Sequence, residues 1–217
     1  TTEIYPLSLH DALPISIWLL IACSVVALAL IFERLYQLRA SRVAPPALID
    51  EVLHVTRSSL PAADVIDKLA QNSTLGQVLA AGLRSVVAEP RITEEALRQA
   101  VENAGRSAVH QTERYLTALG TIASAAPLLG LFGTIIGMIE IFSSQSPTGE
   151  SNPAQLAHGI SIALYNTALG LLVAIPSLMF HRYFRTRVEY FQLTMELAAA
   201  RLVPHLLRFT VRGPKAP

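Results

Sequence analysis

The chain has 217 residues, of which 52% are hydrophobic and only 15% are charged, and its formal net charge is +1. Soluble domains carry about a quarter of charged residues, so this composition, with a mean hydropathy of +0.43, argues against a soluble globular protein. The small net charge argues against a general nucleic-acid binder. One cysteine, Cys23, excludes a disulfide within the chain. We therefore expect a protein of the lipid bilayer with a water-facing part and no nucleic-acid partner.

The first apolar block runs from about Ala12 to Phe32 and follows a segment whose two prolines are expected to interrupt any helix. We interpret residues 1–16 as an N-terminal lead-in that need not be native, and residues 17–33 as the first transmembrane helix. About 20 apolar residues cross the roughly 30 Å hydrocarbon core of a bilayer. A removable signal peptide is the alternative, but the basic region expected before such a segment is absent.

Residues 34–114 form a polar region that we expect to be helical and cytoplasmic. Two short helices are predicted here, at 47–57 and 62–87, separated by the sequence Ser-Ser-Leu-Pro. A longer helix is predicted from Thr93, because two acidic residues in its first turn suit the helix dipole. Apolar and small residues recur in this helix at a spacing of four and three, which is typical of one helical face. The stripe consists of Leu97, Val101, Ala104, Ala108, Gln111, Tyr115 and Ala118.

The rest of the chain holds two more apolar blocks that are long enough to span a bilayer. No helix break separates the helix that begins at Thr93 from the second block, so we expect one continuous helix to enter the membrane. The third block is expected to continue as a helix until Pro204. The predicted segments are a second transmembrane helix at 115–142, a periplasmic turn at 143–157, a third transmembrane helix at 158–181, and a cytoplasmic C-terminal helix and tail at 182–217.

The positions of the basic residues predict how these helices are oriented. All 17 Lys and Arg residues lie either between Arg34 and Arg114 or from Arg182 onward. Basic residues close to membrane segments are retained in the cytoplasm. The expected fold class is therefore an all-α membrane protein with three transmembrane helices and long cytoplasmic helical extensions. Its N-terminus is expected to be periplasmic and its C-terminus cytoplasmic.

Small residues follow one face of each of the last two membrane helices. Such residues let two helix backbones approach closely in a membrane, and hydroxyl or amide side chains can then form hydrogen bonds between the helices, at roughly 1 kcal/mol each. The pattern predicts tight packing between the second and third membrane helices. The predicted packing residues are Gly130, Gly133, Gly137, Gly159, Ala163 and Gly170.

Three polar residues, Thr134, Asn166 and Thr167, lie near the middle of these two helices. A polar group in hydrocarbon costs several kcal/mol unless another group replaces its hydrogen bonds to water. Two interpretations follow, of which one is that these side chains hold the helices together. The other is that they line a path through the membrane. Pro127 and Pro176 are expected to kink the two helices and to free carbonyl groups near this polar face.

Ionisable residues within the membrane blocks are scarce. Glu140 lies near the outer interface, where a solvated carboxylate is favoured over a proton relay. His158 and His181 bracket the third membrane helix at opposite ends, so they cannot form one metal site. No nucleotide-binding, metal-binding or nucleophile motif occurs. We therefore expect no enzyme activity and no cofactor. Three more histidines lack ligand partners at short spacing and are expected to be solvated: His54, His110 and His205.

Two motifs carry a resemblance to a known family. The sequence APLLGLFGTIIGM, from Ala126, followed by HGISIALYNTALGLLVAIP, from His158, closely resembles the ExbB/TolQ/MotA proton-channel family, and within it the ExbB-like biopolymer transport proteins. The resemblance implies a ring-forming homo-oligomer, expected to be a pentamer, in a bacterial inner membrane. It further implies a pore around a single-span ExbD- or TolR-like partner, whose membrane Asp would face Thr134 and Thr167.

The resemblance also implies a function. A proton-channel subunit of this kind would pass energy from the proton motive force, through a TonB-like protein, to transport at the outer membrane. A TolQ-like motor for envelope maintenance, a gliding or adhesion stator, and a non-conducting membrane scaffold remain as alternatives. The chain departs from the family at Ile162, where many ExbB proteins carry a glutamate five residues before the threonine of the third helix. Its three apolar blocks also differ from the four-span flagellar stator subunit.

Overall fold

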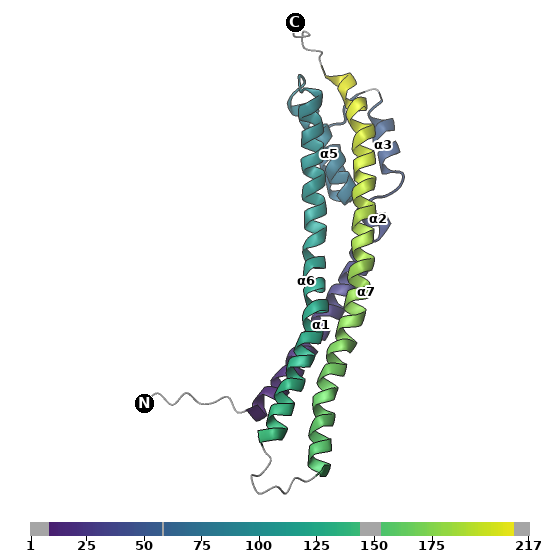
Figure 1. Cartoon of the computed structure of the whole chain (residues 1–217). Helices are drawn as coiled ribbons and strands as arrows, with labels where there is room; N and C mark the ends of the chain where they lie inside the picture. The colour runs from purple at the N-terminus through teal and green to yellow at the C-terminus, as the bar shows by residue number, and fades with distance from the viewer. Residues whose placement is uncertain (1–8, 58, 144–152, 211–217) are drawn as a thin grey trace, which may run out of the picture. The chain divides into compact units, whose positions relative to one another are not determined.

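The computed structural model describes residues 9–57, 59–143 and 153–210, and the regular structure in these ranges is helical (Figure 1). No β-strand occurs among the described residues, so the predicted all-α fold class is confirmed. The helices are α1 (Leu9–Gln37), α2 (Ala40–Val43), α3 (Leu48–Val55), α4 (Ala63–Asn72), α5 (Thr74–Ala88), α6 (Glu94–Ser143), α7 (Pro153–Leu206) and the 3-10 turn η1 (Leu207–Phe209).

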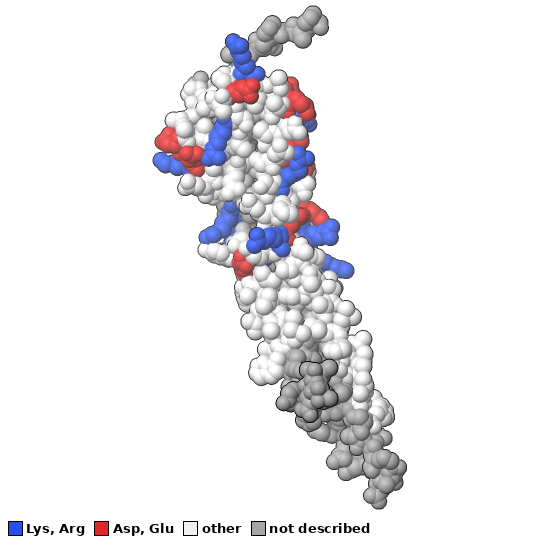
Figure 2. Space-filling view, turned by 90° about the vertical axis from the view of Figure 1, so that its left-hand side faces the viewer, with Lys and Arg blue, Asp and Glu red and all other residues white. Residues whose placement is uncertain are grey.

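The chain divides into two units. The apolar unit comprises residues 1–33 and 115–183, and the charged unit comprises residues 34–114 and 184–217. One part of α6 and one part of α7 belong to the apolar unit, and the remaining part of each helix belongs to the charged unit. Figure 2 shows acidic and basic side chains gathered on one part of the surface and a stretch of described surface without them.

The apolar unit has a small core and a large exposed apolar surface. Its core cluster contains Leu20 of α1, Ala126 of α6 and Ala174 of α7. Among the described residues, three helices are long and apolar enough to cross a membrane, as predicted. Exposed apolar surface of this extent is typical of a face covered by lipid or by another protein. Among the exposed large side chains are Trp18, Phe32, Leu128, Phe132, Leu172 and Met179.

The charged unit has its own core, and α5 lies at the centre of it. The added Cβ of an alanine at Gly82 of α5 would lie 2.9 Å from Val101 Cγ2 and 3.1 Å from Leu202 Cδ2, so α5 packs closely against α6 and α7. An ion pair of 2.5 Å between Arg201 and Asp50 joins α7 to α3. The buried apolar side chains of this core include Leu75, Val78, Leu79, Leu83, Leu97, Val101, Phe191, Leu202 and Leu206.

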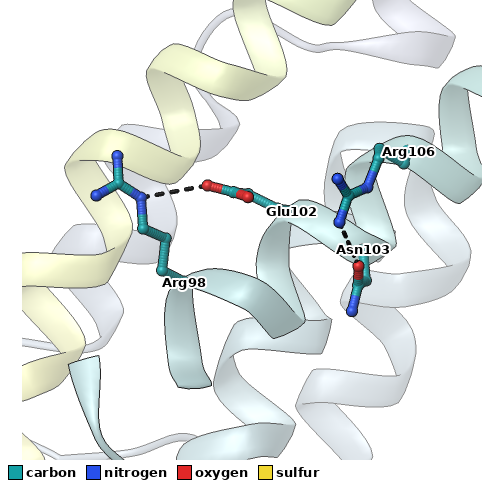
Figure 3. A network of polar contacts seen from close by, with 4 residues as sticks. All are labelled: Arg98, Glu102, Asn103 and Arg106. Atoms are coloured by element: carbon teal, nitrogen blue, oxygen red, sulfur yellow. Dashed lines mark hydrogen bonds and ion pairs between the residues drawn. The ribbon is translucent and has the colours of Figure 1, made fainter. Parts of the chain in front are cut away.

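Helix α6 begins as the sequence predicts. Thr93 precedes it, and the Thr93 hydroxyl accepts a hydrogen bond of 3.2 Å from the backbone N–H of Ala96. Further along its exposed face, Arg98 pairs with Glu102 at 3.2 Å and Arg106 donates to Asn103 at 2.6 Å (Figure 3). The predicted continuous helix from here into the second membrane block is confirmed, because α6 extends to Ser143.

The predicted single helix at 62–87 is wrong, since the structure interrupts it at Ser73. The backbone of Ser73 is extended, and its hydroxyl accepts a hydrogen bond of 3.0 Å from the N–H of Gly76, which caps α5. Gly76 also lies against the preceding helix, because a Cβ there would overlap the carbonyl oxygen of Leu69. The polar run from Gln71 to Thr74 interrupts the apolar spacing here, and its serine is the N-cap signal that could have revealed the break.

The predicted start of the first helix and the predicted end of the last helix also need correction. Helix α1 begins at Leu9 and includes Pro14, so this proline does not interrupt it as expected. Pro6 lies outside the described residues. Helix α7 passes Pro204 and ends at Leu206, because the φ angle that proline fixes is close to the helical value and only one backbone hydrogen bond is lost.

The predicted stripe on α6 is correct in its first half and wrong in its second. Leu97, Val101 and Ala108 are buried, whereas Gln111 and Ala118 are exposed. The buried face passes instead through Leu116, Leu119 and Ala123. Two leucines offer more apolar area to bury than a glutamine and an alanine, so the face shifts by one residue.

His205 is not simply solvated as predicted. Its Nε2 lies 2.9 Å from the hydroxyl of Thr56, which is fully buried, and Arg208 lies 2.8 Å from its Nδ1. His54 and His110 are exposed, as expected. The sequence could have indicated this, because His205 lies at the end of α7 beside Leu202 and Leu206, which are on its buried face.

Candidate functional site

A seam of glycines joins α6 and α7 in the apolar unit. A Cβ on Gly130 would lie 2.7 Å from the carbonyl oxygen of Asn166 and 3.2 Å from the Cα of Gly170. A Cβ on Gly170 would lie 2.6 Å from the carbonyl oxygen of Ala126. The two backbones are therefore in direct contact, and no side chain fits between them. This is the close approach that small residues permit between membrane helices.

The seam continues toward both ends of the apolar unit. At one end, a Cβ on Gly159 would lie 2.5 Å from Cγ1 of Ile141. At the other end, a Cβ on Gly120 would lie 2.9 Å from Nε2 of His181. The residue numbers rise on α7 as they fall on α6, so the helices are antiparallel and in one register throughout.

The predicted packing residues lie in this seam or close to it. Gly130, Gly133, Gly137, Ala163 and Gly170 are buried, and Gly159 is partly buried. Helical spacing predicted that the small residues of each helix share one face of that helix, and the structure brings the face of α6 into contact with the face of α7.

Two hydroxyl groups meet across the seam. The Oγ1 atoms of Thr134 and Thr167 are 2.5 Å apart. Thr134 Oγ1 also lies 3.1 Å from the carbonyl oxygen of Gly130 and 3.0 Å from that of Ala163. Both side chains are half-buried. The structure therefore unites the two threonines that the sequence placed on separate helices.

The chemistry of this threonine pair follows from the atoms present. Each hydroxyl has one proton to donate and two lone pairs that accept. If one hydroxyl donates to the other, the second can donate to a backbone carbonyl. It can also rotate and donate to a water or a carboxylate on the accessible side of the pair. A threonine hydroxyl does not release its proton near neutral pH. The pair can orient a proton carrier but cannot itself take up and release protons.

Asn166 occupies a different place from the threonines. Its side chain is fully buried, and neither Nδ2 nor Oδ1 has a hydrogen-bond partner in the part of the chain that the structure describes. A Cβ on Gly133 would lie 2.8 Å from this Nδ2 and 2.9 Å from Oγ of Ser16 in α1. Within one chain the amide therefore faces the contact between the three helices. A pore-lining role for Asn166 stays a prediction.

Other residues considered from the sequence lie apart from the threonine pair. Tyr165, next to Asn166, is 67% exposed, and Ile162 is 37% exposed. The side chains of Glu140 and His158 lie outside the described residues. Sequence reasoning missed the contact between Gly120 and His181. It could have been found by extending the antiparallel register from Gly130 and Thr167 along both helices.

The part of the chain that the structure describes has three long apolar helices, and its apolar unit has a glycine seam with paired hydroxyls. These features define an all-α integral membrane protein. A sequence profile of the MotA/TolQ/ExbB proton channel family matches residues 70–197, which include the whole seam. The chain belongs to this family.

Individual relatives cover most of the chain. The chain is 37% identical, over 77% of its length and 79% of the relative's, to a biopolymer transport protein called ExbB-like 3 from Synechocystis. It is 31% identical to biopolymer transport protein exbB1 of Vibrio cholerae, over 78% of the chain and 74% of the relative. It is 29% identical to the Tol-Pal system protein TolQ of Pseudomonas aeruginosa, over 78% of the chain and 77% of the relative.

Proposed function

We propose that this chain is the channel subunit of a proton-driven motor in a bacterial inner membrane, and that the motor powers transport at the outer membrane. The observation that supports this most is the pair Thr134 and Thr167, half-buried at a helix seam in an apolar unit. Two hydroxyls at this place serve a proton path better than they serve simple packing, because glycines already supply the contact.

A carboxylate from another protein completes the path. From 116 to 139 in α6 and from 159 to 180 in α7 the sequence has no Asp, Glu, His, Lys or Arg. A charge at the middle of a bilayer is costly, so a proton crosses on a group that binds and releases it. A single-span partner of the ExbD or TolR type, with one membrane Asp, supplies that group. Several copies of the chain, expected to be five, enclose the partner's helix.

The energy released leaves the membrane through a TonB-like protein in this proposal. A Tol-Pal motor is the second candidate, because a TolQ protein is among the relatives of the chain. Deletion of the gene for this chain distinguishes the two candidates. Loss of growth on iron-siderophore complexes supports the TonB-type role. Chaining of dividing cells supports the Tol-Pal role, and loss of surface motility supports a gliding stator.

The proposal is tested by proton flux in liposomes. We expect the chain alone to be nearly proton-tight, and co-reconstitution with the single-span partner to raise the flux at least about tenfold, because the partner brings the missing carboxyl group. Replacing the partner's membrane Asp by Asn should remove the increase. A pH-sensitive dye inside the liposomes measures the flux.

Two results would contradict this division of labour. Robust flux through the chain alone would show that the path needs no partner. An assembled complex without any flux under a proton gradient would favour a non-conducting scaffold.

The proposed orientation is tested by thiol labelling. Two single-cysteine variants, Ser146→Cys and Arg98→Cys, are made in a chain in which Cys23 is replaced by serine. In cells with a permeabilised outer membrane, a membrane-impermeant reagent should label position 146 and leave position 98 unlabelled, because basic residues flank the cytoplasmic side. The opposite pattern would reverse the proposed topology.

A further inference from the structure

The end of the seam nearest Arg182 holds an imidazole packed on a glycine. Three ring atoms of His181, Nε2, Cδ2 and Cε1, lie 2.9, 3.1 and 3.5 Å from the place where a Cβ on Gly120 would be. Any side chain larger than hydrogen at position 120 would displace the ring. The ring is half-buried and makes no hydrogen bond to another described residue.

His181 lies on the same helix seam as the threonine pair. Helix α7 contributes Thr167, Gly170 and His181 to contacts with α6, and α6 contributes Thr134, Gly130 and Gly120 in the reverse order. Fourteen residues separate Thr167 from His181, which is about 20 Å along a helix. The ring therefore lies near the end of the apolar segment, where a proton leaving the pore meets water.

His181 is also the first ionisable side chain on α7 after the apolar stretch from 159 to 180. Imidazole is the side chain whose charge changes closest to physiological pH. The ionisable residues that follow His181 on α7 are Arg182 and Tyr183, and on α6 Glu113, Arg114 and Tyr115 precede Gly120, which the ring contacts. The α6 segment opposite carries none from 116 to 139.

We propose that His181 is the proton carrier at the cytoplasmic end of the channel. The inference rests on the proposed function and names where the proton leaves. The neutral ring accepts a proton at one nitrogen from water in the path, which forms imidazolium. A proton then passes to cytoplasmic water and the ring returns to its neutral form. No other reactant is needed.

The alternative is that the imidazole only fills the space beside Gly120. The two roles can be distinguished in a variant that lacks the His181 ring, by adding a small ring compound and measuring whether the flux recovers. Imidazole and pyrazole have the same shape and nearly the same size, but pyrazole does not become protonated near neutral pH. A filler is replaced by either compound, whereas a proton carrier is replaced by imidazole alone.

The experiment uses the full chain co-reconstituted with its single-span partner, and flux is expressed per assembled complex. We expect His181→Ala to lower the flux about tenfold or more, millimolar imidazole to restore most of it, and pyrazole to restore none. His181→Gln, which keeps a polar side chain of similar length, should be as slow as His181→Ala. His110→Gln, an exposed site in the charged unit, should conduct normally.

Unchanged flux in His181→Ala or His181→Gln would overturn the proposal, as would equal rescue by imidazole and pyrazole. These results differ from failure of the proposed function itself, because that failure would already appear as a lack of flux in the unsubstituted complex. If His181→Ala does not assemble, His181→Gln decides the question, since normal flux in that variant would contradict a carrier role.

Discussion

Replacing Thr167 by valine is expected to lower proton flux about tenfold or more while the complex still assembles. Valine has nearly the same volume but lacks the hydroxyl that lies 2.5 Å from Thr134 Oγ1. A hydrogen bond to a charged group contributes about 1.5–3 kcal/mol, which corresponds to roughly a 10- to 100-fold change in rate. One neutral hydrogen bond between membrane helices contributes only about 1 kcal/mol, so assembly should survive.

The matched control is Thr121→Val, which removes a hydroxyl from α6, the helix that carries Thr134. Thr121 is exposed, and its hydroxyl donates to the carbonyl oxygen of Thr117 in its own helix at 2.9 Å. This variant should conduct normally. Thr134→Val should behave like Thr167→Val, and Ile162→Ala should have a milder effect. Normal flux and assembly in Thr167→Val would exclude the hydroxyl from the path. A flux that falls only in step with lost assembly would assign it to packing alone.

Replacing Gly170 by alanine is expected to destabilise the apolar unit by about 1–3 kcal/mol, because one methyl group must enter a backbone contact. The added carbon would lie 2.6 Å from the carbonyl oxygen of Ala126 and 3.1 Å from the Cα of Gly130. Backbone atoms cannot turn aside as a flexible side chain can, so the helices must separate. Separation would also lengthen the bond between the threonines, and we expect flux to fall together with stability.

A second glycine provides the control for this variant. Gly105 lies within α6 in the charged unit, and a Cβ there would meet nothing within 4 Å. Gly105→Ala should leave stability unchanged or raise it by up to about 1 kcal/mol, because alanine is the better helix former. The midpoint of thermal unfolding in detergent measures both variants. A midpoint for Gly170→Ala equal to that of the unsubstituted chain would show that the seam tolerates the methyl group.

The three membrane helices could be predicted because each rests on a local property. A continuous run of about 20 apolar residues predicts a bilayer span from length alone. The break at Ser73 could not be predicted in the same way. It depends on one hydroxyl that accepts from the N–H of Gly76, which is a capping interaction and not a property of the apolar pattern. The exposed Gln111 was misplaced because two stripes one residue apart fit the spacing nearly equally well.

The sequence by itself determined that glycines, threonines and an asparagine lie near the middle of two apolar helices, because composition and helical period are properties of one segment. It also determined that these segments lack a carboxyl group at mid-span. Only the tertiary structure decided that Thr134 meets Thr167 and that His181 packs on Gly120. It likewise decided that Asn166 is enclosed while Thr167 stays half-buried. These pairings depend on the register between two antiparallel helices, and that register is set where two backbones touch at Gly130 and Gly170.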